Sequence, residues 1–456
     1  MKLKAIILAA GEGKRMKSHL PKVLHKVCEQ PMIEHVVEAA EGSNVEECIV
    51  VVGHGAEEVK KSLPSHIKTV LQEKQLGTGH AVMMAYDHID DDSLVLVLAG
   101  DGPLITQDTL NALMEYHKNG GYSATVLTTD LTNPYGYGRI VRGDDLQLEK
   151  IVEEKDTTPE EKMIQEINSG IYCFSGEALR KALPLVKNEN AQKEYYLPDV
   201  LTIMKEDGRG VGVYKTLDYK EIMAVNDRVQ LAEVEEIMRS RINQYHMREG
   251  VTIINPSNTY IGKKVKIGQD TIIYPGATLK GNTVIGEGTV IGSNTVIDDS
   301  SIGNNVEIQS STLIESKVDD FTTVGPYAYL RPNSVVGKHC KIGDFVELKN
   351  AQMGDYSKAS HLAYIGDAEV GKHVNIGCGV VFVNYDGVNK HKTIVEDHAF
   401  VGSNANLIAP VVVRKNGYVA SGSTITKEVP EKALAVARAK QVNKEEWVAR
   451  KGLLKE

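Results

Sequence analysis

Two clusters of glycine and charged residues in the first half of the chain could carry chemistry on a phosphorylated substrate. The first spans residues 11–15 (GEGKR) and directly follows an apolar run at 5–10. A glycine loop exposes backbone N–H groups that can hold phosphate oxygens, and the basic residues of the loop and Lys22 add positive charge. The loop is neither GxGxxG, because Met16 stands where the third glycine belongs, nor a Walker A loop. Alone, it is equally well explained as a glycine turn with solvated charges.

The second cluster is residues 99–103 (AGDGP), directly after the apolar run 94–98 (LVLVL). A carboxylate that follows a buried strand beside a phosphate loop is well placed to hold Mg²⁺. This hard cation prefers oxygen ligands and shares them with substrate phosphates. Asp101 could equally cap the turn after the strand. The spacing alone leaves both interpretations open.

The elements that must position these clusters alternate between strand-like and helix-like segments over residues 1–226. The sequence predicts strands at 5–8, 47–52 and 94–98, and helices at 23–39 and 106–118. Such alternation predicts an α/β, Rossmann-like domain with a mostly parallel sheet and helices on both faces. These sheets bind ligands beyond the carboxyl ends of their strands, where both clusters fall.

The second half of the chain has a period of six. Every sixth residue is aliphatic at Ile261, Ile267, Ile273, Leu279, Ile285, Ile291 and Ile297. This period fits neither an amphipathic helix nor strand alternation. It predicts a parallel β-helix, in which each hexapeptide is a short strand plus a turn and successive coils stack their aliphatic side chains. An ordinary sandwich of Val- and Ile-rich strands is the less favoured alternative. The repeats run from about 251 to 425, and the polar insertion at 382–392 predicts a projecting loop.

Residues between the two halves predict one long helix that links two domains. Apolar residues recur at three- and four-residue spacing between Leu231 and Tyr245, a stripe that is better explained by packing than by cofactor binding. We therefore expect domains at 1–226 and 251–456, with a helical linker at 227–250. The tail, residues 427–456, is charged and predicted to be helical.

Composition narrows the class of protein. A net charge of −9 argues against a general nucleic-acid binder. Five scattered cysteines without a CxxC pair indicate free thiols in a reducing compartment. The apolar run near the N-terminus is too short for a signal peptide, and no run approaches a membrane span. We expect a cytoplasmic protein that binds neither nucleic acid nor membrane.

Six motifs that follow one another in register identify a family. They are LAAGEGKRM at 8–16, LPKVL at 20–24, QLGTGH at 75–80, GYGRI at 136–140, INSG at 167–170 and VNDR at 225–228. Together they resemble sugar-1-phosphate nucleotidyltransferases. Combined with the hexapeptide repeats, they resemble the bifunctional bacterial N-acetylglucosamine-1-phosphate uridylyltransferases/glucosamine-1-phosphate N-acetyltransferases over nearly the whole chain.

The resemblance implies an enzyme that acetylates glucosamine-1-phosphate with acetyl-CoA. It then transfers uridylyl from UTP to N-acetylglucosamine-1-phosphate, with release of pyrophosphate. The product, UDP-N-acetylglucosamine, is a precursor for peptidoglycan and lipopolysaccharide. The resemblance further implies Mg²⁺, a left-handed coil for the β-helix, and a homotrimer whose subunits share the acetyl-transfer sites.

For the first half, the resemblance implies roles for individual residues. Contacts to the nucleotide and its phosphates would come from Leu8, Ala9, Ala10, Gly11, Lys22, Ala99, Gly100 and Asp101. Uracil would be selected by Gln72, Gly77 and Thr78, and the sugar would be bound by Gly138, Glu153, Asn168 and Asn226. Asp101 and Asn226 would hold Mg²⁺, and Arg15 is the candidate for stabilising charge on the transferred phosphates. Ala99 stands where an aromatic residue can occur and Gly102 follows Asp101, so both positions bear on uridylyl affinity.

For the second half, the resemblance implies His361 as the general base. By residue type alone, a lone histidine is more often structural. The sugar phosphate would be clamped by Arg331 and Lys349, and the sugar and its amine fixed by Tyr364, Asn375 and Asn384. Acetyl-CoA would be bound by Cys378, Asn384, Tyr385, Ser403, Ser421 and Arg438. Cys378 is explained either as a small apolar side chain or as a thiol close to the coenzyme A sulfur, which would make acetyl transfer sensitive to alkylation.

Two alternatives compete with the bifunctional enzyme. One is a nucleotidyltransferase for another sugar phosphate, with the β-helix serving only assembly. The other is a non-enzymatic oligomeric scaffold that binds sugar nucleotides. Assembly needs none of His361, Arg331 and Lys349, and their presence together argues against both alternatives.

Overall fold

The computed structural model describes residues 2–144 and 147–455 of the chain. They form two compact units, and the division falls between Arg239 and Ser240, inside helix α7 (Arg228–Arg248). Helix α7 lies where the sequence predicts the linking helix. Among the described residues, no helix combines the length and the apolar character that crossing a bilayer requires.

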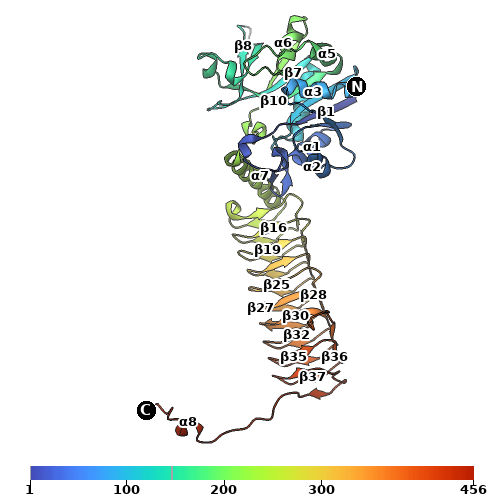
Figure 1. Ribbon diagram of the computed structural model, residues 1–456, viewed down its shortest axis with the longest axis vertical. Coiled ribbons are helices and arrows are strands. Elements are labelled where there is room, and N and C mark those ends of the chain that lie inside the picture. The colour runs from blue at the N-terminus through green and yellow to red at the C-terminus, as the bar shows by residue number, and fades with distance from the viewer. Residues whose placement is uncertain (1, 145–146, 456) are drawn as a thin grey trace. The chain divides into compact units, whose positions relative to one another are not determined.

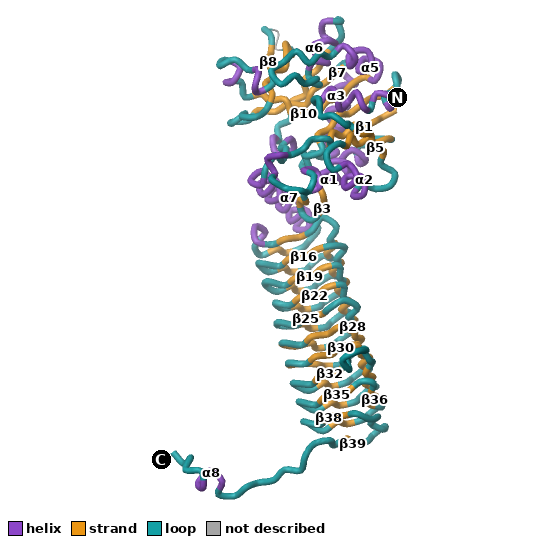
Figure 2. Tube along the Cα trace, viewed as in Figure 1, coloured by secondary structure: helices purple, strands orange, loops and turns teal. Residues whose placement is uncertain are grey.

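The first unit is built on one mixed sheet of nine strands, in the order β11-β7-β10-β6-β1-β4-β5, with β8 paired to β10 and β9 paired to β8. Figure 2 shows the strands of this unit in orange with helices in purple around them. Strands β1, β4, β5 and β6 are parallel, whereas β10 runs antiparallel to both β6 and β7. The bounds are β1 (Lys2–Ala9), β4 (Glu47–Val52), β5 (Lys68–Leu71), β6 (Ser93–Ala99), β7 (Ala124–Asp130), β8 (Gly138–Arg142), β9 (Leu148–Val152), β10 (Glu166–Ser175) and β11 (Val211–Lys215).

Helices cover both faces of this sheet, which explains the unbroken apolar sequence of its central strand. Leu96 and Val97 of β6 are both fully buried, but they belong to separate core clusters on opposite faces. The helices are α1 (Met32–Gly42), α2 (Ala56–Ser62), α3 (Thr78–Met84), α4 (Gln107–Asn119), α5 (Gly176–Ala182) and α6 (Asp199–Glu206). The predicted strands at 5–8, 47–52 and 94–98 and the predicted helix at 106–118 are therefore confirmed.

The predicted helix at 23–39 is wrong in its first part. A short antiparallel hairpin of β2 (Lys26–Val27) and β3 (Gln30–Pro31) precedes α1, which begins only at Met32. Cys28 and Glu29 turn the chain with φ values of 45° and 73°, which no α-helix allows. Pro31 then lacks the N–H that a continuing helix would need.

The second unit is a stack of short parallel strands, each paired with the strand one coil away (Figure 1). One sheet contains β12 (Thr252–Ile253), β15 (Ile272–Ile273), β18 (Val290–Ile291), β21 (Glu307–Ile308), β24 (Thr323–Val324), β27 (Lys341–Asp344), β29 (Lys358–His361), β31 (Asn375–Ile376), β34 (Phe400–Val401), β37 (Tyr418–Val419) and β39 (Leu434–Ala435). The other contains β13 (Tyr260–Ile261), β14 (Lys266–Ile267), β16 (Thr278–Lys280), β17 (Val284–Ile285), β19 (Val296–Asp298), β20 (Ser301–Ile302), β22 (Thr312–Ile314), β23 (Lys317–Val318), β25 (Tyr329–Leu330), β26 (Val335–Val336), β28 (Glu347–Met353), β30 (Tyr364–Val370), β32 (Val381–Val383), β33 (Thr393–Val395), β35 (Asn406–Ile408), β36 (Val411–Val413) and β38 (Thr424–Ile425).

Burial explains the six-residue period. Six of the seven repeated aliphatic residues are buried, with Ile273, Ile291 and Ile297 fully so, and Ile267 is half-buried; the repeated position therefore fills the centre of the coils. Threonines at the second repeated position are also buried, and two of them, Thr271 and Thr289, donate to the backbone of the next coil. Thr289, for example, donates from its Oγ1 to the Gly303 carbonyl at 3.0 Å. Coils thus stack through apolar contacts and buried hydrogen bonds together.

The predicted fold class, a Rossmann-like α/β unit followed by a parallel β-helix, is confirmed, and the stack is consistent with a left-handed coil. The structure differs in the tail, where helix among the described residues 427–455 is limited to α8 (Trp447–Arg450). Trp447 of this segment is 47% exposed. A short charged segment with no packed apolar face gains too little to offset helix nucleation.

Candidate active sites

A cavity of about 360 Å³ opens where strands β1, β5 and β6 end. Loop residues after these strands supply most of its wall, as expected for the carboxyl edge of a parallel sheet. The lining residues are Leu8, Ala9, Ala10, Gly11, Lys22, Val23, Gln72, Gln75, Gly77, Thr78, Ala81, Ala99, Asp101, Gly170 and Glu194. Most of the predicted nucleotide-binding residues are therefore brought together. Gly100 lies behind them, where a Cβ would come within 2.9 Å of the Leu8 carbonyl oxygen.

Three predicted residues from distant parts of the chain converge at one end of this cavity. The Lys22 ammonium forms an ion pair with the Asp101 carboxylate and donates to the Asn226 amide oxygen at 2.9 Å. The Asp101 carboxylate oxygen and the Asn226 amide oxygen therefore both face the Lys22 ammonium group. The two oxygens fit Mg²⁺, which is commonly held by one or two protein ligands and completes its shell with water and substrate phosphates.

The loop of residues 75–80 closes another side of the cavity. The buried Gln72 side chain donates from Nε2 to the Gly77 carbonyl at 3.2 Å and contacts His80 Nδ1 at 2.9 Å. Gly77 has φ +108°, and a Cβ there would lie 2.6 Å from the Tyr195 carbonyl oxygen. Only glycine fits this position. The Thr78 hydroxyl accepts from the Leu197 N–H at 3.1 Å, which ties the loop to the chain behind it.

The predicted sugar-binding residues form a second cluster beside the cavity. Gly138 on β8 pairs with Asn168 on β10, and Glu153 Oε1 lies 3.2 Å from where a Gly138 Cβ would stand. Asn168 Oδ1 accepts from the Gly170 N–H at 3.0 Å, and Gly170 lines the cavity. Burial, together with nearby carboxylates, raises the pKa of Glu153. Because residue 138 is a glycine and has no Cβ, the space in front of the Glu153 carboxylate stays open.

The remaining candidate of this half, Arg15, is exposed on the 3-10 turn Lys14–Met16 and lies outside the cavity wall given above. The turn itself is anchored: the Met16 side chain is buried, and Arg228 Nε donates to the Met16 carbonyl at 3.3 Å. Arg228 Nη1 also contacts His25 Nδ1 at 3.2 Å. Burial, followed by the charge of Arg228, lowers the pKa of His25, so a neutral ring accepts this bond.

In the β-helix, His361 stands beside a carboxylate. Strand β29 pairs with β27 so that His361 lies opposite Asp344, and His361 Nδ1 is 2.6 Å from Asp344 Oδ1. The hydrogen bond from His361 lowers the pKa of Asp344. Motif reasoning missed Asp344, because the contact follows from the coil register and not from any short motif.

The predicted phosphate clamp lies in the same coils. Arg331 Nη1 is 3.0 Å from Glu347 Oε1, and Lys349 Nζ is 4.0 Å from Asp367 Oδ2. The proximity of Lys390, followed by burial, lowers the pKa of Lys349. Lys390 was missed as a site residue, although it lies in the insertion predicted to project.

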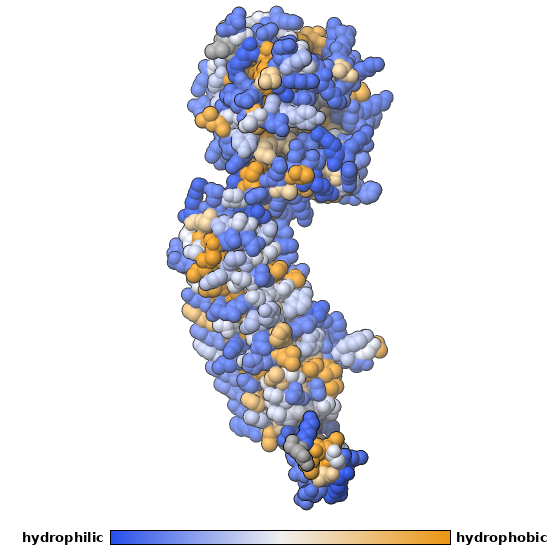
Figure 3. All heavy atoms as spheres, turned by 90° about the vertical axis from the view of Figure 1, so that its left-hand side faces the viewer, coloured by the Kyte–Doolittle hydropathy of each residue, from blue (hydrophilic) through white to orange (hydrophobic). Residues whose placement is uncertain are grey.

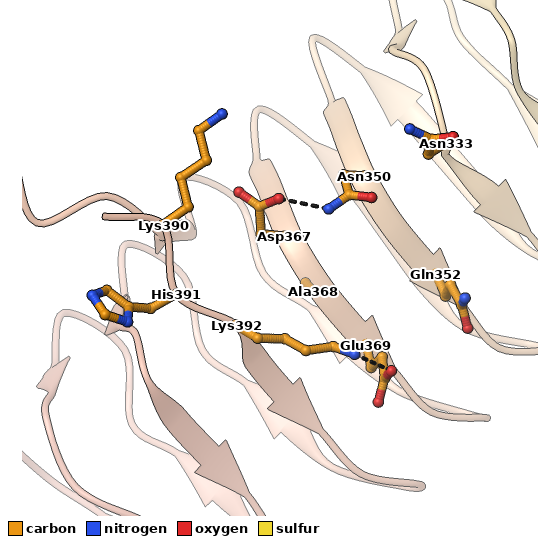
Figure 4. Close-up of a pocket in the computed structure, with 9 residues that line it drawn as sticks. All are labelled: Asn333, Asn350, Gln352, Asp367, Ala368, Glu369, Lys390, His391 and Lys392. Atoms are coloured by element: carbon orange, nitrogen blue, oxygen red, sulfur yellow. Dashed lines mark hydrogen bonds and ion pairs between the residues drawn. The ribbon is translucent and has the colours of Figure 1, made fainter. Parts of the chain in front are cut away.

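Figure 4 shows the cavity of about 300 Å³ that this insertion closes. Lys390 extends beside the Asp367 carboxylate, which accepts from Asn350 at 2.7 Å. Hydrogen bonds from Asn350 and Asn384 hold the pKa of Asp367 below its usual value, although burial opposes them. The loop is stiffened by Asp386, whose pKa falls to about 2 because it accepts from Asn389 N–H, His391 and Val388 N–H.

Other predicted sugar-binding residues occupy neighbouring coils. Tyr364 on β30 pairs with Glu347 of β28, and Asn375 on β31 pairs with Lys358 of β29. The Asn384 side chain donates to Asp367 Oδ2. Asn384 is thereby linked to Asp367, the carboxylate that lies beside Lys349 of the predicted phosphate clamp.

Four of the predicted acetyl-CoA residues follow one another down the stack. The Asn404 N–H donates to the carbonyl of Cys378, the Gly422 N–H donates to that of Ser403, and Arg438 Nη1 reaches the carbonyl of Ser421 at 3.0 Å. Cys378 is an exposed free thiol. Tyr385 lies apart in the projecting loop, where its hydroxyl donates to the Gly387 carbonyl at 2.6 Å.

Comparison with known proteins gives matches to part and to all of the chain. Residues 5–165 match the family model described as a MobA-like NTP transferase domain. Over the full length, the chain is similar to the bifunctional protein GlmU of Alkaliphilus oremlandii, with 68% identity over 455 residues and 100% of both chains covered. It is 65% identical to GlmU of Alkaliphilus metalliredigens, over 99% of both chains. It is 58% identical to GlmU of Clostridioides difficile, over 99% of this chain and 98% of that one.

Proposed function

The chain belongs to the family of the bifunctional protein GlmU, and from this we infer that it is an enzyme with two activities that together make UDP-N-acetylglucosamine for cell-wall biosynthesis. The β-helix transfers acetyl from acetyl-CoA to glucosamine-1-phosphate. The first unit then transfers uridylyl from UTP to N-acetylglucosamine-1-phosphate and releases pyrophosphate. The observation that carries this conclusion is that the similarity runs through both units, and not through the nucleotidyltransferase unit alone.

In acetyl transfer, His361 acts as the general base. Its free ring nitrogen removes a proton from the substrate amine as the amine nitrogen attacks the thioester carbonyl. The new C–N bond forms, the C–S bond breaks, and coenzyme A leaves with the electron pair of that bond. The proposal is supported by the exposed position of His361, and by the coil-to-coil hydrogen bonds from Gly379 N–H to the Leu362 carbonyl and from Asn404 N–H to the Cys378 carbonyl, which place the predicted acetyl-CoA residues on the coils that follow.

Three cations hold the phosphate of glucosamine-1-phosphate. Arg331 offers a fork of N–H donors, and Lys349 and Lys390 add point charges. Two neighbouring ammonium groups repel each other, which the lowered pKa of Lys349 reflects. A bound phosphate relieves this repulsion, so the arrangement favours a dianionic ligand. Tyr364, Asn375 and Asn384 orient the sugar and its amine from the adjoining coils.

In uridylyl transfer, a phosphate oxygen of N-acetylglucosamine-1-phosphate attacks the α-phosphorus of UTP, and pyrophosphate leaves. The chain contributes positioning and charge: the N–H groups of residues 8–11 and the Lys22 ammonium face the phosphates. Arg15 reaches the leaving phosphates from its exposed turn, which Arg228 anchors. Asp101 and Asn226 would hold Mg²⁺, which when bound neutralises phosphate charge.

The uracil base and the N-acetylglucosamine sugar are recognised by two different groups of residues beside the phosphate-binding residues. Gln72, Gly77 and Thr78 contact uracil, and Gly138, Glu153, Asn168 and Asn226 contact the N-acetylglucosamine part. The glycine at 138 leaves room for a sugar hydroxyl beside the Glu153 carboxylate.

We further propose a homotrimer, a cytoplasmic location and domains at 1–226, 227–250 and 251–456. Figure 3 shows apolar groups scattered over the mostly hydrophilic face of the β-helix that it displays. Exposed aromatic side chains of this unit include Tyr260, Phe321, Tyr327 and Tyr356, which contact with a second copy would cover. All five cysteines are free, which suits a reducing compartment.

Two variants of the full-length enzyme test the proposal. His361→Ala should stop release of coenzyme A and leave uridylyl transfer intact, whereas Asp101→Asn should have the opposite effect. Loss of both activities in either variant would mean that the two reactions share one site. If both variants keep both activities, the roles proposed for His361 and Asp101 are wrong.

A further inference from the structure

We propose that Asp344 is a positioning residue for acetyl transfer, which holds the His361 ring in the orientation and tautomer that leave Nε2 free to accept the proton of the substrate amine. This inference rests on the proposed acetyltransferase function and adds a residue to its site. Asp344 would act through His361 and would not itself touch the substrate.

The geometry is set by the register of the coils. Strands β27 and β29 pair in parallel with Asp344 opposite His361, 17 residues apart in the chain. Their side chains meet at 2.6 Å between Oδ1 and Nδ1. Both residues belong to strands, which position side chains more firmly than a loop does.

The charge of Asp344 determines which ring nitrogen of His361 carries the hydrogen. The hydrogen bond from His361 lowers the pKa of Asp344, so the group is a carboxylate at neutral pH and can only accept. The hydrogen therefore sits on His361 Nδ1, and the lone pair is on Nε2. A fixed Nδ1–H···carboxylate bond both selects the tautomer and stabilises the ring once it has taken up a proton.

Other groups near the pair do not provide this function. The coil that follows the coil of His361 carries Cys378, a free thiol and not a carboxylate; the Gly379 N–H joins the two coils by donating to the Leu362 carbonyl at 2.7 Å. On the preceding coil, Lys341 acts on Asp344 by charge and lowers the pKa of that carboxyl further. On the strand of His361 itself, Lys358 pairs with Lys341 and Asn375. Asp344 is thus the carboxylate that the described contacts place against the imidazole.

A comparison within the β-helix argues against a purely structural role. Asp320 accepts from the Asn304 backbone N–H of the neighbouring coil at 2.9 Å and pairs with Lys338 at 2.8 Å. It therefore joins coils through the backbone and a surface ion pair. The side-chain bond of Asp344 goes instead to the proposed catalytic base.

The test uses Asp344→Asn and Asp344→Ala in the full-length enzyme, with Asp320→Asn as the matched control. Asparagine keeps the shape and an acceptor oxygen but loses the charge, whereas alanine loses both. Acetyl transfer is followed by release of coenzyme A between about pH 5.5 and 9, which brackets the usual titration of histidine. Uridylyl transfer by the same preparations reports intact folding.

We expect kcat for acetyl transfer to fall about tenfold in Asp344→Ala, which is less than the roughly 10²- to 10⁴-fold that a general base itself contributes, because Asp344 only orients the base and the two side chains are 60% (His361) and 38% (Asp344) exposed. KM for glucosamine-1-phosphate should stay within about twofold. Removing the negative charge should also move the acidic limb of kcat/KM to lower pH in both variants, because the ring then loses its proton more readily. Asp320→Asn should change none of these.

An unmoved acidic limb in Asp344→Asn, or a kcat within about twofold of the parent enzyme in Asp344→Ala, would overturn the proposal. If Asp344→Ala does not fold, the isosteric Asp344→Asn and its pH profile decide alone. Failure of the unmodified enzyme to release coenzyme A would instead refute the proposed acetyltransferase function, so the two failures are distinguishable.

Discussion

Replacing Lys22 by methionine should disable uridylyl transfer while leaving acetyl transfer untouched. Methionine keeps most of the length and apolar stem of lysine but removes its charge. The Lys22 side chain is only 15% exposed and touches both Asp101 and Asn226. It is therefore fixed at the place where we propose that substrate phosphates and Mg²⁺ meet.

The size of the effect follows from charge and distance. Two unit charges about 4 Å apart interact by about 4 kcal/mol at the effective dielectric of about 20 that applies near protein surfaces. Part of this is already present in the ground state, where the substrate phosphates are bound. We therefore expect a loss of about 2–4 kcal/mol in transition-state stabilisation, or about 30- to 1,000-fold in kcat/KM.

The assay is release of pyrophosphate from UTP and N-acetylglucosamine-1-phosphate. Release of coenzyme A by the same preparation serves as the internal control. Lys60→Met provides a matched control, because Lys60 is a surface residue whose ammonium pairs only with the exposed Glu57 among the contacts described. A change of less than about threefold in Lys22→Met would refute the assignment of Lys22 to the phosphates.

Three further predictions concern stability, pH and metal. Thr289→Val should lower the free energy of unfolding of the β-helix by about 1–3 kcal/mol, because the buried hydroxyl bonds both the Gly303 carbonyl and the Val306 N–H. Thr295→Val should leave the free energy of unfolding unchanged or raise it, because the buried Thr295 hydroxyl has no partner among the described residues. Urea titrations followed by circular dichroism measure both variants, and an equal loss of stability in Thr289→Val and Thr295→Val would contradict this prediction. Because the pKa of Glu153 is raised and an ionised carboxylate accepts hydrogen bonds from sugar hydroxyls more strongly than a neutral carboxyl does, KM for N-acetylglucosamine-1-phosphate should rise as pH falls. Glu153→Gln should abolish that pH dependence, and persistence of the dependence would exclude Glu153 as its cause. Chelation by EDTA should stop pyrophosphate release without slowing release of coenzyme A, and loss of both would place metal in both reactions.

The β-helix is the part of the fold that the sequence predicts best, because one physical requirement repeats in every coil. An aliphatic residue must fill the centre, and Ile273 and Ile291 do so without exposure. The start of α1 is harder to predict. The apolar pattern through 23–39 suits a helix, but the left-handed turn at Cys28 and Glu29 depends on the tertiary hairpin that precedes Pro31.

The same distinction holds for the sites. Residues in contiguous motifs, such as Gly77 and Asp101, could be named because glycine geometry and a carboxylate after a strand leave local signals. Asp344 and Lys390 could not. Their contacts depend on coils of 17 or more residues and on an insertion whose fold is not periodic. Only the three-dimensional register brings Asp344 to His361.

The most direct test of the account supplies the purified protein with glucosamine-1-phosphate, acetyl-CoA, UTP and Mg²⁺, and separates the products. We predict UDP-N-acetylglucosamine, coenzyme A and pyrophosphate in equal amounts. Accumulation of N-acetylglucosamine-1-phosphate without pyrophosphate would contradict the role proposed for the first unit, with Ala99 and Gly102 the first positions to examine. Absence of coenzyme A release would contradict the role of the β-helix and leave it as an assembly element.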